Sequence, residues 1–365
     1  MEEKKKNLND TSEDNELELI ESLEQAIRDN LNTLKTDIKS SLNQSDVSKD
    51  LTQNSKEKKG AKVRVKKSNS FINYFGNLPT LSPRVLNKFD INIPNFKNSI
   101  TNFLENLSLE SFYYYISIYK IIGEDFNLDL EKILTILEDH INSGMFVSSE
   151  TEVPDVKSIF LGLSILSEFD YYKSSELIDF DKIEDFLRFE LERIKPEKLH
   201  INYNALNSVN LLNRKDFRIE LDSDEIFNKI RDFDISSLEN FDPTIDYYEF
   251  FSCIQILDSE EILNDMKNKY ENIIINTFDN LELQKLSITA AARVLLTIDL
   301  LNLKNEKNQL IKRLLDKLMN STRMFNSDIE EIDFSWNKDK IAWLLELRML
   351  FWALLASFRF YSFIK

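Results

Sequence analysis

The feature that most constrains the fold is a pattern that recurs five times along the chain. Each copy is an apolar helical segment centred on one small residue. These small residues are Ser117, Gly162, Ser208, Cys253 and Thr297. The intervals between them are 45, 46, 45 and 44 residues, too long for a coiled-coil heptad and regular enough to mark a structural repeat. We therefore predict that the middle of the chain is an array.

The composition predicts that each repeat is a pair of helices. The 365 residues include only 5 Gly and 6 Pro, which leaves few of the turn residues that a many-stranded sheet needs. In every copy a second, more polar helical pattern follows the first after a polar break, and one such hairpin cannot bury both apolar faces alone. The expected fold is all-α, an array of about six hairpins of about 45 residues each, spanning residues 97–365.

The part of the chain before the array has a different composition. Residues 1–70 are predicted to be a largely disordered polar and basic arm with one amphipathic helix from about Leu17 to Leu42. Residues 71–96 mix aromatic residues with Pro and Gly, and are either an extended segment packed on the array or a short linear motif. The absence of an apolar stretch at the N-terminus favours a cytoplasmic location.

Charge is unevenly distributed. The net charge is −17, yet the stretch from Lys56 to Lys67 holds seven basic residues against one acidic residue. This stretch either contacts an anionic surface or is simply solvated. Because the rest of the chain is acidic and repels phosphate groups, nucleic acid is not expected as the main partner.

Two columns of the aligned repeats are polar or aromatic. They stand five residues before and two residues after the small residue, within about 20° of each other on a helical wheel. On the inner helix of a curved array they would line a central cavity, and otherwise they form a solvated face. The candidate ligand-binding residues are Tyr119, Lys157, Ser164, Tyr203, Asn210, Tyr248, Gln255 and Asp299. None of them is assigned to the core.

Groups that could perform catalysis are scarce. The single cysteine, Cys253, lies in the small-residue column, which favours packing over a role as nucleophile. The only histidines are His140 and His200, and His200 is expected to be structural or solvated. We predict no catalytic residue, no metal site and no cofactor.

One stretch of the chain resembles a known family. Ser143, Gly144 and Phe146 form a predicted turn, Pro154 and Asp155 a loop, and residues 158–166 and 180–194 an inner and an outer helix. This order is similar to the repeat of protein prenyltransferase β subunits and of squalene and terpene cyclases. The resemblance extends at lower quality through all five repeats and implies an α/α toroid, either closed or incomplete.

The family's catalytic motifs do not carry over. Prenyltransferases of this type hold zinc with an Asp-x-Cys pair and a His. Here the comparable place is Asp246-Tyr247-Tyr248, so Tyr248 stands where the thiolate would be. Asp155 and Asp246 share one column and are predicted to cap helix N-termini, as are the acidic strings at Asp179 and Asp222, which lack the Asp-x-Asp-Asp pattern of the cyclases.

The last apolar segment, Ile341 to Ile364, is nearly long enough to span a bilayer. Glu346, Arg348 and Arg359 interrupt it, and charges within a span are costly. Ala342 lies 45 residues after Thr297, so we predict a sixth inner helix rather than a membrane span.

Two functions follow as expectations. The favoured one is a non-catalytic toroid that binds a protein tail, a peptide or a lipid group in its central cavity. The alternative is an isoprenoid-handling enzyme or prenyltransferase-like subunit whose catalytic residues are completed by a partner chain. A third possibility is an open solenoid of the HEAT type that only resembles the toroid, and in it the first and last repeats would lie far apart.

Overall fold

The structure is a computed structural model that describes residues 78–89, 107–123, 130–148, 152–169, 176–214, 223–235, 241–257, 260–321 and 337–364. All of these belong to the second of two compact units, Lys62–Lys365, the first being Met1–Ala61. The predictions for the arm of residues 1–70, and for the parts of the 71–96 segment on either side of residues 78–89, lie outside the described residues.

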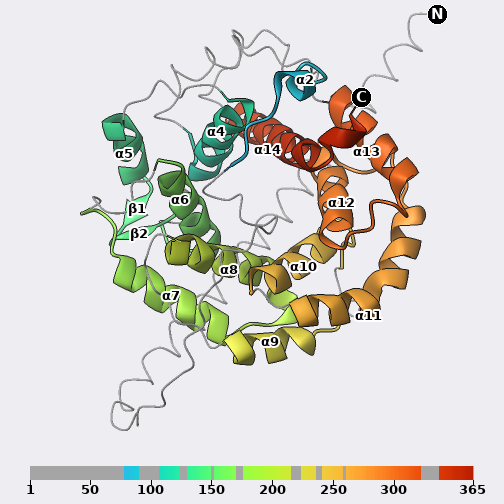
Figure 1. The fold of residues 1–365 in the computed structure, drawn as a ribbon. Coiled ribbons are helices and arrows are strands. Elements are labelled where there is room, and N and C mark those ends of the chain that lie inside the picture. The colour runs from blue at the N-terminus through green and yellow to red at the C-terminus, as the bar shows by residue number, and fades with distance from the viewer. Residues whose placement is uncertain are drawn as a thin grey trace, which may run out of the picture. The chain divides into compact units, whose positions relative to one another are not determined.

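The described residues are mostly helical, as the sequence predicts, and the helices alternate between two sets (Figure 1). The inner helices are α4 (Leu109–Ile122), α6 (Val156–Glu168), α8 (Leu199–Arg214), α10 (Asp246–Ile256), α12 (Ile288–Leu300) and α14 (Asn337–Arg359). The outer helices are α5 (Leu130–Glu138), α7 (Phe180–Glu192), α9 (Ser223–Arg231), α11 (Glu260–Asp279) and α13 (Asn308–Ser321). Five short elements complete the described part: α2 (Pro83–Leu86), β1 (Ile141–Asn142) with β2 (Met145–Phe146), η4 (Pro196–Lys198) and η8 (Tyr361–Phe363).

Contacts join the inner helices in chain order. α4 packs on α6, α6 on α8, α8 on α10, α10 on α12 and α12 on α14, and α14 packs in turn on α4. Among the outer helices, α7 packs on α8, α11 on α10, and α13 on both α12 and α14. Each inner helix therefore has an inner neighbour on both sides.

These neighbours explain the difference in sequence between the two sets. Nearly every residue of α4 and α6 is buried, because other elements cover these helices on several sides. The outer helix α7 has one apolar stripe, and only Ile183, Leu187 and Leu191 of this helix are buried. Their spacing of four residues places them on one face, and the opposite face carries charged side chains.

The acidic residues predicted as helix caps behave in two ways. Asp155 precedes α6, and its Oδ1 accepts the backbone N–H of Ser158 at 2.9 Å. Asp179 caps α7 in the same way, so both predictions are confirmed. Asp246 differs, because it is the first residue of α10 and its carboxylate accepts the backbone N–H of Asp242 at 2.8 Å. Asp222 lies outside the described residues.

The predicted turn at residues 143–146 is a tight β-hairpin between β1 and β2. Ser143 and Gly144 both have positive φ, 53° and 84°, as a two-residue hairpin turn requires. The ring of Phe146 packs directly on Gly162 of α6, where an added Cβ would lie 2.3 Å from the ring. The small residue in this repeat therefore accommodates the hairpin, whereas the sequence led us to expect that it would let two helices approach.

The predicted sixth inner helix corresponds to α14. Its residues 350–357 are all buried, and it packs on α12 and α4. Within the described part of the chain, no helix has the length and apolar character needed to cross a membrane.

Candidate functional site

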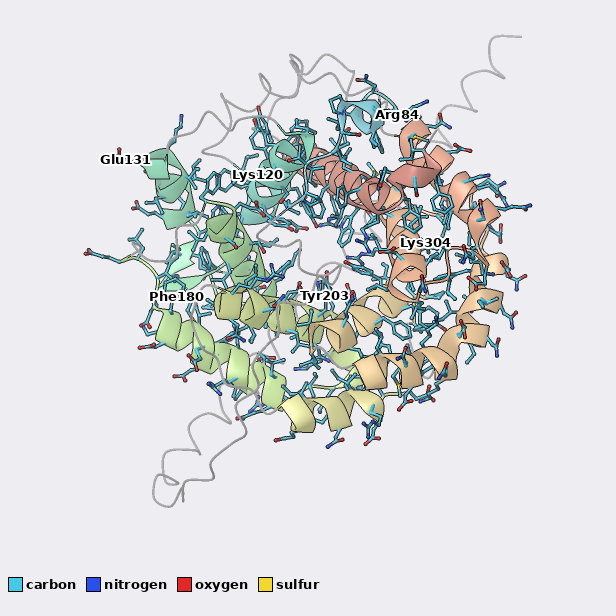
Figure 2. The ribbon with its side chains drawn as sticks, in the orientation of Figure 1. Arg84, Lys120, Glu131, Phe180, Tyr203 and Lys304 are labelled. Atoms are coloured by element: carbon cyan, nitrogen blue, oxygen red, sulfur yellow. The ribbon has the colours of Figure 1, made fainter. Side chains whose placement is uncertain are left out.

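A small pocket lies where side chains of α4, α6, α8, α12 and α14 meet. Its volume is about 40 Å³. Its lining residues with polar side-chain atoms are Tyr113, Tyr114, Lys157, His200, Tyr203, Asn204, Arg293 and Trp352. We call it the inner-helix pocket. Tyr203 lies on the side of α8 that faces the other inner helices (Figure 2).

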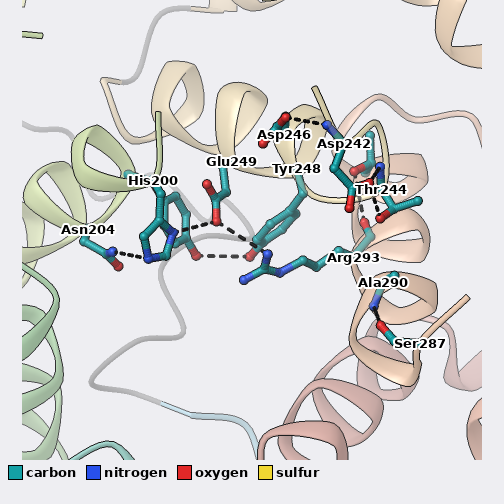
Figure 3. Close-up of polar contacts among 12 residues, drawn as sticks. His200, Asn204, Asp242, Thr244, Asp246, Tyr248, Glu249, Ser287, Ala290 and Arg293 are labelled. Carbon is teal, nitrogen blue, oxygen red and sulfur yellow. Dashed lines mark hydrogen bonds and ion pairs between the residues drawn. The ribbon is translucent and has the colours of Figure 1, made fainter. Parts of the chain in front are cut away.

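A line of polar contacts crosses three inner helices beside this pocket (Figure 3). Asn204 of α8 donates its amide N–H to Nε2 of His200 at 3.1 Å. Nδ1 of His200 donates to Oε1 of Glu249 on α10 at 3.0 Å. The same carboxylate oxygen lies 3.5 Å from Nη1 of Arg293 on α12, and the Glu249 side chain is only 2% exposed. Both ring nitrogens of His200 are therefore held by the protein.

Aromatic side chains surround Arg293. The guanidinium carbon of Arg293 lies 4.8 Å from the centre of the Trp352 ring, a cation–π contact between α12 and α14. Trp352 meets Tyr248 edge to face at 5.6 Å, and the hydroxyls of Tyr248 and Tyr203 are 3.4 Å apart. Burial raises the pKa of both tyrosines, so the two phenols are neutral at physiological pH.

A second charged cluster joins α4, α6 and α14. The carboxylate of Glu110 is 2.5 Å from Nζ of Lys157 and 2.6 Å from Nη2 of Arg348. Burial alone would raise the pKa of Glu110, but the two cations outweigh it and hold this pKa below its usual value. Glu110 is therefore ionised, and two cations face one carboxylate.

Within the described residues, two guanidinium donors near the pocket are buried without a partner, Nε of Arg293 and Nε of Arg348. Nε1 of Trp352 interacts with the hydroxyl of Tyr114. The hydroxyl of Tyr113, which lines the pocket on α4, is also buried and interacts with Ser117. Buried polar groups without partners are uncommon in proteins, so this concentration is the distinctive chemical property of the pocket.

The structure brings three of the predicted site residues to this region. Lys157 and Tyr203 line the pocket, and Tyr248 touches Tyr203 and Trp352. All three belong to the column five residues before the small residue. Tyr203 and Tyr248 are 3% and 2% exposed, so they are part of the core, which the sequence did not lead us to expect.

The column two residues after the small residue lies elsewhere. Ser164 is buried and donates to the carbonyl of Phe160 in its own helix, and Tyr119 packs on Tyr115. Asp299, near the C-terminal end of α12, is 2.5 Å from Nζ of Lys304 and 2.6 Å from Nε of Arg359. The two remaining candidates, which do not line the pocket, are the half-buried Asn210 and Gln255.

Sequence reasoning missed five residues of this site, namely His200, Asn204, Glu249, Arg293 and Trp352. A signal was present, because Asn204, Glu249 and Arg293 all stand four residues before the small residue of their repeats. His200 was set aside as structural or solvated, and its side chain is indeed 56% exposed while it contacts Glu249. No repeat alignment identifies Trp352.

The groups considered for metal or thiol chemistry are placed as follows. Cys253 is 1% exposed, and burial raises the pKa of its thiol. His140 is buried, and its Nε2 donates to the carbonyl of Leu107. Within the described residues, no three His, Cys, Asp or Glu side chains gather in a way that could hold a metal ion.

A wider, shallow hollow of about 610 Å³ lies between the hairpin turn and the start of α7. Its four charged lining residues are Glu176, Asp179, Asp181 and Lys182, all of them exposed or half-buried, and Lys182 pairs with Asp179 at 3.1 Å. The inner-helix pocket is therefore the stronger candidate site.

Comparisons with protein-family models, with curated proteins and with solved structures found no match to this chain.

Proposed function

We propose that this chain is an α/α toroid that binds a protein tail, a peptide or a lipid group at the inner-helix pocket and performs no catalysis itself. The toroid is supported by the succession of inner-helix contacts, in which α14 packs on α4. The ion pairs of Glu110 with Lys157 and Arg348 support the same arrangement. The cytoplasmic location expected from the sequence belongs to this proposal.

The observation that carries the binding function is the unpaired buried donor Arg293 Nε in a pocket between inner helices. Leaving such groups without acceptors costs free energy, which a ligand that supplies acceptors would recover. This is the pattern of a preformed binding site with few polar groups fixing the ligand.

The contacts of His200 favour binding over acid and base catalysis. A histidine that transfers protons to a substrate needs one ring nitrogen within reach of that substrate. Here Asn204 occupies Nε2 and Glu249 occupies Nδ1. We interpret His200 as a residue that positions Glu249 and, through it, Arg293.

The proposal is tested by affinity capture from the native cell. The full chain, a chain lacking residues 1–70, and an Arg293→Met variant serve as baits. We expect one partner or lipid to be retained by the full chain and lost with Arg293→Met. Loss with the truncated chain as well would assign a second contact to the basic arm. A retained set that is the same for the full chain and Arg293→Met would overturn the proposal.

The competing function, an isoprenoid-handling subunit completed by a partner chain, makes different predictions. It requires stoichiometric zinc in the purified protein, or tight binding of an isoprenoid diphosphate that depends on the pocket residues. Elemental analysis and a diphosphate binding assay on the full chain measure both. A positive result in either assay would replace our proposal.

A further inference from the structure

The walls of the inner-helix pocket offer more donors than acceptors. Trp352 is 4% exposed and lines the pocket, where its indole N–H interacts with the hydroxyl of Tyr114, another lining residue. Arg293 also lines it, with Nε unpaired and with Nη1 in a long 3.5 Å contact to Glu249. A guanidinium donor prefers an anionic acceptor, because charge-assisted hydrogen bonds are about twice as strong as neutral ones.

The surrounding charges also favour an anion. Lys157 and Arg348 share the single carboxylate of Glu110, so this cluster carries one positive charge in excess. Lys157 and His200 are the second residues of α6 and α8, and both line the pocket. The pocket is therefore close to the N-terminal ends of two long helices, where the helix dipole attracts negative charge.

The size of the pocket limits the anion. A volume of about 40 Å³ corresponds to roughly three water-sized positions. A carboxylate has three heavy atoms, whereas an isoprenoid diphosphate has many more. The His200 side chain is 56% exposed where it lines the pocket, so the remainder of a longer ligand can extend into solvent beside it.

From these observations we infer that the inner-helix pocket binds a carboxylate group, held by Arg293 beside the Trp352 ring and attracted by Lys157. The inference rests on the proposed binding function and specifies which part of the ligand enters the pocket. The carboxylate belongs either to a free organic acid or to the C-terminus of a peptide chain.

The test uses the full chain labelled with 5-fluorotryptophan and ¹⁹F NMR. The sequence contains three tryptophans, and the signal of Trp352 is assigned by its loss in Trp352→Phe. Sodium acetate, sodium chloride and sodium phosphate are each titrated into the protein separately at constant ionic strength, and the shifts they cause are compared. We expect a saturable shift of the Trp352 signal with acetate and a much smaller one with chloride.

Matched variants locate the effect. Arg293→Met should weaken acetate binding at least tenfold, as the loss of a charge-assisted hydrogen bond implies. Because Arg293 is 13% exposed and its loss could disturb the fold, the half-exposed Lys157 provides a second variant. Lys157→Gln should weaken binding severalfold. Lys182→Gln removes the same charge from the outer helix α7 and should leave acetate affinity unchanged.

A second arm distinguishes the two sources of the carboxylate. N-acetyl-glycylglycine is compared with its C-terminal amide and with acetate. Binding of the free acid more tightly than acetate assigns the site to a peptide C-terminus, and binding of acetate alone assigns it to a small acid. Equal binding of acid and amide overturns the carboxylate inference.

Two further results would also overturn it. One is a Trp352 shift that is no larger with acetate than with chloride. The other is that Lys157→Gln and Lys182→Gln bind acetate with equal affinity while circular dichroism shows both to be folded. If acetate fails but partner capture still depends on Arg293, the binding function stands and the ligand is not a carboxylate. If acetate does not bind and partner capture does not depend on Arg293, the proposed function and the carboxylate inference are both wrong.

Discussion

The charge state of Glu110 is coupled to the stability of the fold. Its pKa is held below the usual value by Lys157 and Arg348, despite burial. A carboxyl with a lowered folded-state pKa contributes stability above its unfolded-state pKa, and this stability is lost as the pH falls through the folded-state pKa. The contribution is therefore complete at pH 7 and disappears below the usual range for Glu.

We predict that Glu110→Gln lowers the free energy of unfolding by roughly 1–3 kcal/mol at pH 7, because it leaves two cations without their carboxylate. The difference from wild type should shrink as the pH falls below about 4.5. Urea unfolding at pH 7, 5 and 3.5 measures this. Glu131→Gln, at an exposed position of α5, is the control. If the unfolding free energies of Glu110→Gln and wild type differ by the same amount at all three pH values, Glu110 does not contribute through its ionised carboxylate.

Cys253 gives a second prediction for a single residue. Its thiol is buried and its pKa is raised by burial, so the reactive thiolate is both rare and covered. We expect no reaction with a chromogenic disulfide reagent in the folded protein at pH 8, and one equivalent after denaturation. Rapid reaction of the native protein would contradict the packing role.

At the scale of single elements, the hairpin β1–β2 packs closely on α6 through Phe146 and Gly162. Gly162→Ala places a methyl group against the Phe146 ring, so we predict a loss of about 1–3 kcal/mol from overpacking. Ser208→Ala changes the same column of the next repeat, where only a hydroxyl bonded within its own helix is lost, and should cost less than about 1 kcal/mol. Thermal or urea unfolding compares them.

A rescue experiment tests the cause. Phe146→Leu shortens the side chain that faces Gly162 and should reduce the penalty of Gly162→Ala when both changes are combined. Additive losses in the double variant would show that the strain arises elsewhere in α6.

The elements could largely be predicted from the sequence. The predicted helix 158–166 lies within α6, and the predicted helix 180–194 begins with α7 at Phe180 and runs two residues past its end at Glu192. Periodicity identifies such helices because each buries a particular face, and the acidic caps Asp155 and Asp179 mark where two of them begin. The hairpin was predicted only as a turn, since strands of two residues leave no period in the sequence.

The site was predicted less well, for a physical reason. A helical wheel identifies which residues share a direction, but not whether that direction meets solvent or another helix. Tyr203 and Tyr248 were interpreted as outside the core, and contact with each other and with Trp352 buries them. Altering Tyr203, Tyr248 and Gln255 together would leave stability unchanged only if all three lay outside the core. The triple variant should be clearly destabilised, by several kcal/mol, because two buried rings are removed.

At the scale of the whole repeat domain, the contact between α4 and α14 separates a toroid from an open solenoid. Glu110 and Arg348 are 238 residues apart in sequence and 2.6 Å apart in space. We predict that Glu110→Arg and Arg348→Glu each lower the free energy of unfolding. In the double variant the two charges can pair again, so its loss should be about 1–3 kcal/mol smaller than the sum of the two single losses.

The matched control is the ion pair of Glu184 and Arg188 within α7. The same reversal there should show a coupling energy of only a few tenths of a kcal/mol, since both residues lie on one exposed helix. Chemical denaturation of the four variants in each cycle supplies the numbers. A coupling energy near zero between residues 110 and 348 would favour the open solenoid.

The packing of α14 on α4 has a consequence during protein synthesis. The partner of Glu110 leaves the ribosome 238 residues after it, which corresponds to roughly 10–50 s of translation. Until then α4, rich in buried tyrosine and isoleucine, lacks the neighbour that covers one of its sides. Because α4 packs on α14, we expect the side of α4 that α14 covers to stay exposed on the nascent chain throughout that interval, as an apolar surface that chaperones can bind.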